Sequence, residues 1–191
     1  MTKYLSSSIL FVALCVSLAL GGCSSAPADD TFFGWLFSPK RMKGVAPAQD
    51  EVYVEECGAC HMPYQPGLLP ARSWHRLLDA KALADHFGEN AELDEETRRH
   101  LLEYASAHAA DASYYKRSRK VMASLRDDQA PLRITEVPYI HDKHEEIPAA
   151  LITANPKVKS LSFCNRCHRK ADAGIYDDDT VVIPGHGRWD D

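Results

Sequence analysis

The sequence predicts a mainly α-helical protein, small in size, with two lobes and irregular loops. Apolar residues recur at helical spacing in several segments between residues 50 and 125. Prolines and a glycine mark a loop at residues 63–70, and Pro131 and Pro138 bracket a linker. Beyond residue 139 the helical pattern weakens and the chain has the character of irregular loops. We therefore expect a larger lobe at residues 50–128 and a smaller lobe at residues 129–191.

Two helices are predicted in the first half of the larger lobe. The first runs from Asp50 into a cysteine-containing segment that begins at residue 57. Ser73 is the expected N-cap of a second helix, which reaches Phe87 and ends at Gly88. Four residues of this second helix share one face at helical spacing, namely Trp74, Leu78, Ala82 and His86.

Two further helices and one extended segment follow. One helix is expected at residues 94–109, with an inward face formed by Leu101, Leu102 and Tyr104. The next, at residues 112–125, is basic and carries Lys116, Arg117, Arg119 and Lys120. Residues 132–137 are expected to be extended. The basic residues of the helix at 112–125 form either a solvated helix face or a docking surface for an acidic redox partner.

The N-terminal residues have the features of an export signal. Lys3 precedes an apolar run, Ile9 to Leu20, which is too short for a comfortable membrane span. The small residues that follow it, just before Cys23, resemble a bacterial lipobox. We therefore predict a lipoprotein signal peptide at residues 1–22, a lipid on Cys23 and a tether at residues 23–49.

The alternative is an ordinary secretory peptide cut slightly later, which would leave Cys23 as a free thiol. An exported protein seldom keeps an unpaired cysteine, which favours the lipoprotein interpretation. Ser24, where an aspartate would favour retention in the inner membrane, favours the outer membrane. The expected location is therefore the periplasm, with the body of the chain anchored to a membrane by lipid.

The four remaining cysteines outside the signal form two C-x-x-C-H motifs, which is the attachment pattern of haem c. The first motif contains Cys57, Cys60 and His61, and the second contains Cys164, Cys167 and His168. Two thiols separated by two residues can bind both vinyl groups on one edge of a porphyrin, and the next histidine reaches the iron. A thioredoxin-type disulfide or a zinc site would need no histidine directly after both cysteine pairs. We therefore expect two covalently attached haem c groups.

The ligand on the opposite face of each iron decides between electron transfer and ligand chemistry. Methionine is scarce, since only Met42 and Met122 are plausible candidates. Histidine is more abundant, and seven residues outside the motifs are available: His75, His86, His100, His108, His141, His144 and His186. This supply favours two histidine ligands at each iron.

Several segments of the chain resemble the dihaem cytochrome c family of periplasmic proteobacterial cytochromes. They include the run Tyr-Gln-Pro-Gly-Leu-Leu-Pro-Ala-Arg-Ser-Trp at residues 64–74, the His-Phe-Gly segment at residues 86–88, and residues 144–148. The resemblance implies a small helical c-type cytochrome with two bis-histidine haems. It assigns His86 to the first haem and His144 to the second. His75, His141 and His186 are the alternatives.

The expected function is electron transfer, and no enzymatic activity is expected. The resemblance suggests a membrane b-type cytochrome or another quinol-linked donor, and a small periplasmic haem protein as acceptor. The alternatives are a dihaem peroxidase-like enzyme, with Glu145 or Glu146 as acid–base group, and a ligand-binding haem sensor with one open iron. The net charge of −5 argues against a nucleic-acid partner.

Overall fold

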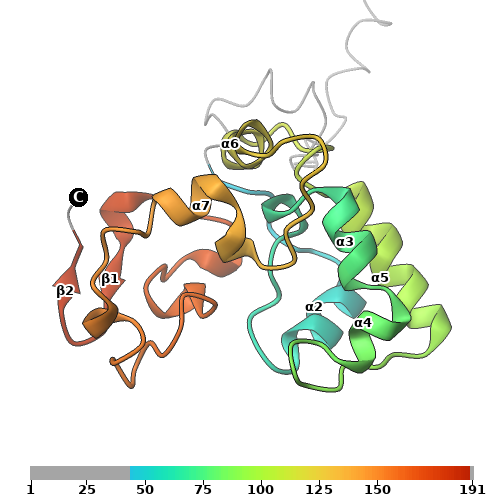
Figure 1. The fold of residues 1–191 in the computed structure, drawn as a ribbon, viewed down its shortest axis with the longest axis horizontal. Coiled ribbons are helices and arrows are strands. Elements are labelled where there is room, and N and C mark those ends of the chain that lie inside the picture. Colours follow the sequence, from blue (N-terminus) through green and yellow to red (C-terminus); the bar gives the residue numbers. More distant parts are fainter. Residues whose placement is uncertain (1–43, 190–191) are drawn as a thin grey trace, which may run out of the picture.

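The computed structural model describes residues 44–189, and they form a mainly helical body, as the sequence predicts (Figure 1). The described residues contain six α-helices: α2 (Glu51–Gly58), α3 (Ala71–Leu77), α4 (Ala80–Ala84), α5 (Glu95–Ala107), α6 (Lys116–Ser124) and α7 (Pro138–Asp142). The predicted signal peptide, Cys23, Met42 and most of the tether lie outside the described residues. Between residues 44 and 189, no helix has the length and apolar character needed to cross a membrane.

Aspartate caps explain where two of the predicted helices begin. The Asp50 carboxylate accepts a hydrogen bond from the backbone N–H of Tyr53 at 2.8 Å, at the start of α2. The Asp94 carboxylate accepts one from Thr97 at 2.9 Å, at the start of α5. Both helices therefore lie where the sequence predicts them.

The single helix expected from Ser73 to Phe87 is wrong. The chain forms two shorter helices there, since α3 already begins after Pro70 and ends at Leu77, and α4 begins after Asp79. The Asp79 carboxylate accepts a hydrogen bond from the backbone N–H of Lys81 at 3.0 Å, which caps a new helix and competes with continuation of the old one. His86 consequently follows α4 in a turn.

The main hydrophobic core lies between α2, α3 and α5, which pack side by side (Figure 1). Leu101 and Ala105 of α5 are fully buried in it. The ring centre of Tyr53 in α2 lies 6.3 Å from the ring centre of Trp74 and 5.1 Å from that of Tyr104. This core holds the helix that carries the first cysteine motif at its C-terminal end.

The C-terminal part of the chain consists mainly of short 3₁₀ turns, as the weak helical pattern predicts. These turns are η3 (Ala149–Leu151), η4 (Cys164–Arg166), η5 (Ala171–Ala173) and η6 (Asp178–Thr180). A two-stranded antiparallel sheet follows, with β1 (Val182–Ile183) paired to β2 (Gly187–Arg188). Ile152, Val158, Val181 and Ile183 form a small core beneath these elements.

The extended segment expected at residues 132–137 is wrong, because residues 134–136 form a 3₁₀ turn, η2, that leads directly into α7. The Glu136 side chain accepts a hydrogen bond from the backbone N–H of Arg133, which favours the turn. Pro138 occupies the first turn of α7, where its missing N–H is not needed.

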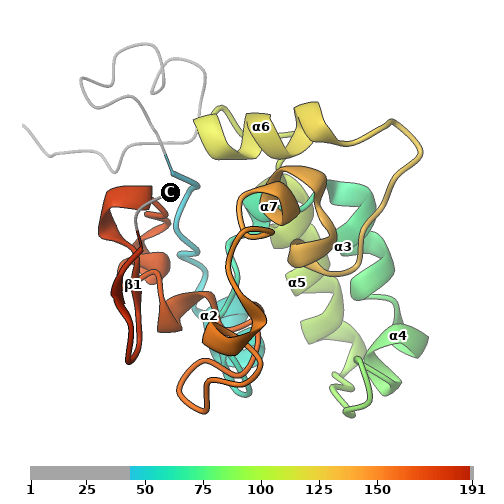
Figure 2. The ribbon, with the colours of Figure 1, turned by 60° about the vertical axis from the view of Figure 1, so that its left-hand side comes forward.

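Backbone and side-chain hydrogen bonds join the two ends of the described chain. The segment after residue 44 runs beside the C-terminal elements (Figure 2), and Val45 N–H donates to the carbonyl of Gly174 at 2.9 Å. The Gln65 amide donates to the carbonyl of Ala171 at 2.7 Å and accepts from the Tyr176 hydroxyl. These contacts hold the two cysteine motifs in one body.

Candidate functional site

The first motif lies at the C-terminal end of α2, which places Cys57 against the main core and leaves Cys60 exposed. Burial raises the pKa of the Cys57 thiol to about 12. The next residue after the motif's second cysteine, His61, has Nδ1 2.7 Å from the carbonyl oxygen of Met62. Since a carbonyl only accepts hydrogen bonds, Nδ1 is the donor, and in the neutral ring the lone pair that could bind a metal is on Nε2.

His86 lies in a tight turn, residues 86–89, that two backbone hydrogen bonds between His86 and Glu89 close. Its pKa is lowered by burial and by the nearby charges of His61 and Arg133, which places His86 in the vicinity of the first motif. Phe87 follows with a φ of 57°, in the left-handed region, and the Arg133 guanidinium lies 3.9 Å from its ring centre.

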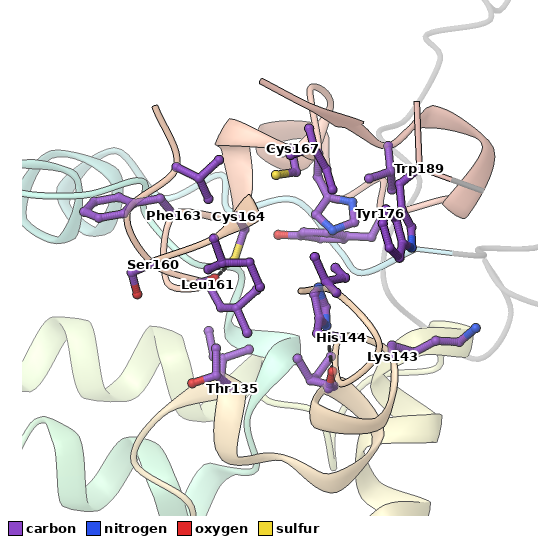
Figure 3. A pocket seen from close by; sticks show the side chains of 18 of the residues that line it. Thr135, Lys143, His144, Ser160, Leu161, Phe163, Cys164, Cys167, Tyr176 and Trp189 are labelled. Carbon is purple, nitrogen blue, oxygen red and sulfur yellow. Dashed lines mark hydrogen bonds between the residues drawn. The ribbon is translucent and has the colours of Figure 1, made fainter. Parts of the chain in front are cut away.

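The second motif lines a cavity whose walls are mainly apolar. Cys164, the first residue of η4, and Cys167, the residue directly after this turn, both line it. The apolar walls include Ile140, Ile147, Ile152, Leu161, Phe163 and Ile183. Figure 3 shows Cys164, Cys167 and Tyr176 on one side of this cavity and His144 and Thr135 on the other. An apolar pocket with two thiols and two imidazoles has the composition that a covalently bound porphyrin needs.

His144 and His168 oppose one another across this cavity. Their ring centres are 6.1 Å apart, and their planes cross at 70°. Since a metal–imidazole bond is about 2 Å long, two imidazoles that ligate one ion from opposite sides have ring centres about 6 Å apart. His144 Nδ1 lies 2.7 Å from the carbonyl oxygen of Ile140 and donates to it, so in the neutral ring the lone pair that could bind a metal is on Nε2.

The electrostatics of the cavity also suit a metal-bound porphyrin. Burial, together with the nearby charges of His144 and Arg117, lowers the pKa of His168 to about 4, so its imidazole is neutral at pH 7. Burial raises the pKa of the Cys164 thiol to about 11. Among the described residues, neither His168 Nδ1 nor Arg117 Nε has a hydrogen-bond partner, although both atoms are buried. The Arg117 donor is available for an anionic group such as a haem propionate.

The alternative ligands lie elsewhere. His75 is exposed on α3, whereas His86 follows α4 in a separate turn. His141 is exposed and lies 3.6 Å from the Asp142 carboxylate, while His186 packs its ring 6.0 Å from Trp189. None of these three histidines lines the cavity between His144 and His168. Met122 packs against the main hydrophobic core.

Tyr64 joins the two motifs in a way that sequence reasoning missed. Its ring stacks on His61 at 4.6 Å with an interplanar angle of 28°. Its hydroxyl donates to the carbonyl of Ser162, two residues before Cys164, at 2.5 Å. The sequence contained no signal for this contact, since the two partners are separated by 98 positions.

The basic pattern of α6 suggests that Arg117 is exposed, but in the structure its side chain is partly buried and has hydrogen-bond partners. Its guanidinium donates to the Tyr139 hydroxyl at 3.0 Å and to the carbonyl of Tyr176 at 2.7 Å. The same residue lines the cavity of the second motif. Arg117 is therefore a structural contact between α6 and the C-terminal part, and the exposed cations of α6 are Lys116, Arg119 and Lys120.

Comparisons with known proteins identify a family and similar structures. The sequence profile of the dihaem cytochrome c family matches residues 53–176. An X-ray structure of a dihaem cytochrome c from Shewanella baltica is 41% identical, covers 75% of this chain and 99% of its own, and has a TM-score of 0.62. A dihaem cytochrome c from Rhodobacter sphaeroides is 38% identical, covers 69% of this chain and 100% of its own, and has a TM-score of 0.61. None of the curated proteins compared with the chain matches it.

Proposed function

The chain belongs to the dihaem cytochrome c family and carries two covalently attached haem c groups, and we propose that it transfers electrons through two irons that are each ligated by two histidines. The proposed pairs are His61 with His86 and His144 with His168. The observation that carries the proposal is the opposition of the His144 and His168 rings at 6.1 Å across an apolar cavity.

The residues of the cavity have separable roles in this function. A haem iron supplies reversible one-electron oxidation and reduction when it is bound. Cys164 and Cys167 would hold the porphyrin, and the apolar walls would exclude water from it. The hydrogen bond from His144 to the Ile140 carbonyl fixes the ring orientation and increases the basicity of Nε2. Arg117 would bind a propionate.

Two strong ligands on each iron leave no coordination position for a substrate, which favours an electron carrier over an enzyme. The peroxidase-like alternative requires His144 to leave the iron and Glu145 or Glu146 to act as the acid–base group. Both glutamates are exposed, and neither lines the cavity. The site therefore supports electron transfer better than peroxide chemistry.

The proposal extends to location and partners. Attachment of haem c to C-x-x-C-H motifs outside the cytoplasm, together with the expected signal peptide, supports a periplasmic protein that is lipid-anchored at Cys23, with the outer membrane favoured. We propose a membrane b-type cytochrome or another quinol-linked protein as donor, and a small periplasmic haem protein as acceptor.

Carbon monoxide tests the ligation. We expect the optical spectrum of the dithionite-reduced protein to be unchanged by carbon monoxide, because histidine closes both faces of each iron. In His144→Ala, one of the two haems should acquire a carbon monoxide spectrum, whereas His141→Ala, three residues away and exposed, should behave as the parent protein. A carbon monoxide shift in the parent protein would contradict bis-histidine ligation.

A further inference from the structure

A second pocket in the C-terminal part of the chain is strongly basic. Four of its lining residues are cationic, namely Lys157, Lys159, Arg166 and Arg169, and its lining contains no acidic residue. All four side chains are exposed. Within residues 44–189, none of them forms an ion pair or side-chain hydrogen bond. We call this feature the basic pocket.

The basic pocket adjoins the cavity of the second motif. Val158 and Phe163 line both, so one layer of side chains separates the two spaces. The lining of the basic pocket also includes Asn165 and Arg166, the two residues between the cysteines of the second motif.

From this placement we propose that the basic pocket docks a carboxylate-rich surface of a redox partner protein at the edge of the second haem. The inference rests on the proposed electron-transfer function. Transient redox complexes bury small interfaces and use charge to steer the encounter. Because the whole chain carries a net charge of −5, it repels an acidic partner at long range. A local group of unpaired cations therefore decides where such a partner approaches.

The proposal is distinct from the docking surface that the sequence suggested on α6. There, Arg117 is held by Tyr139 and Tyr176, and Lys120 lies 5.2 Å from the Tyr139 ring centre. The cations of the basic pocket have no such contacts. The basic pocket also lies beside the two cysteines that would attach the second haem, so a partner docked there is close to the group that exchanges the electron.

Two charge-matched variants of the holoprotein test the proposal. Lys157, Lys159 and Arg169 are replaced together by glutamine in the first, and Lys116, Arg119 and Lys120 in the second. Each variant loses two lysines and one arginine, and Arg166 is kept so that haem attachment is not disturbed. The probe is a fluorescently labelled octaglutamate peptide, whose binding to the oxidised protein is followed by anisotropy at low ionic strength.

We expect the pocket variant to bind the peptide about tenfold more weakly than the parent protein, because clustered charge changes association by about 10-fold or more. The α6 variant should bind nearly as the parent does. Bound peptide should also slow oxidation of the reduced parent protein by ferricyanide, which takes one electron from a ferrous haem and becomes ferrocyanide. This protection should be lost in the pocket variant.

Three results would overturn the proposal: equal affinity of the two variants, weaker binding by the α6 variant alone, or pocket-dependent binding of phosphatidylglycerol vesicles or inorganic phosphate without binding of octaglutamate. Circular dichroism and the visible spectrum check that each variant is folded and fully loaded with haem. Peptide binding to the oxidised protein needs no electron transfer. A failure of the docking proposal is therefore distinguishable from a failure of the proposed function. The latter would be detected as carbon monoxide binding by the parent protein.

Discussion

Replacement of Arg117 by glutamine tests whether this residue joins α6 to the C-terminal part. In the structure its guanidinium donates to the Tyr139 hydroxyl and to the Tyr176 carbonyl, at 3.0 and 2.7 Å. The Tyr176 ring lies 5.7 Å from the guanidinium carbon. Arg119 is two residues away on the same helix and is exposed, so Arg119→Gln removes the same charge without these contacts.

The magnitude follows from the two hydrogen bonds. A hydrogen bond to a charged group contributes about 1.5–3 kcal/mol to stability. Because Arg117 is only partly buried, water can replace some of what is lost, and the lower end of this range applies to both bonds. Arg117→Gln should therefore lower the free energy of unfolding by about 3 kcal/mol, which for a protein of this size lowers Tm by about 6–12 °C. Arg119→Gln should change stability by less than about 0.5 kcal/mol.

Thermal unfolding followed by circular dichroism measures the difference between the two variants, and a redox titration measures the second consequence. Removal of a positive charge beside the second haem favours the ferric state, so its reduction potential should fall in Arg117→Gln and stay unchanged in Arg119→Gln. Equal Tm values for the two variants would refute the role of Arg117 as a structural contact. Unchanged potentials would refute its proximity to the second haem.

Two further predictions concern backbone strain and the first haem. Gly174→Ala should destabilise the protein by about 2–3 kcal/mol, because an L-residue at φ 69° costs about 1–2 kcal/mol. The added Cβ would also lie 2.0 Å from the Val45 carbonyl oxygen, so the backbone must move at the expense of about one hydrogen bond. An unchanged midpoint of urea unfolding would contradict this prediction. His86→Ala should open the first iron, so that the reduced variant binds carbon monoxide at one haem. Binding in His75→Ala instead would move the assignment to His75.

The sequence predicted the local structure well wherever a short-range signal specified it. The aspartate caps at Asp50 and Asp94 determine where α2 and α5 begin, because the capping bond involves a residue three positions away. The same reasoning failed between Ser73 and Phe87. There the apolar spacing favoured one helix, but the Asp79 side chain competes for the backbone and begins a second helix.

At the second haem site, too, the sequence predicted some residues from local spacing and left others undecided. The attachment motif around Cys164 could be recognised from spacing alone, because the chemistry of thioether attachment requires that spacing. The choice of His144 rested on resemblance, since spacing left His141 and His186 as alternatives. In the structure His144 faces the cavity, whereas His141 is exposed. Side chains three residues apart on a short helical turn have different environments, and only packing against the rest of the chain decides which one is buried.

The sequence by itself determined that the chain carries two covalent haems, because C-x-x-C-H encodes its chemistry within five consecutive residues. It also determined the mainly helical fold. Only the tertiary structure decided that Tyr64 bridges the two motifs and that Arg117 lines the second cavity. The same holds for the four cations that gather beside the second motif. These contacts join residues far apart in the chain, and no local pattern of charge or hydrophobicity specifies which distant partner a side chain will meet.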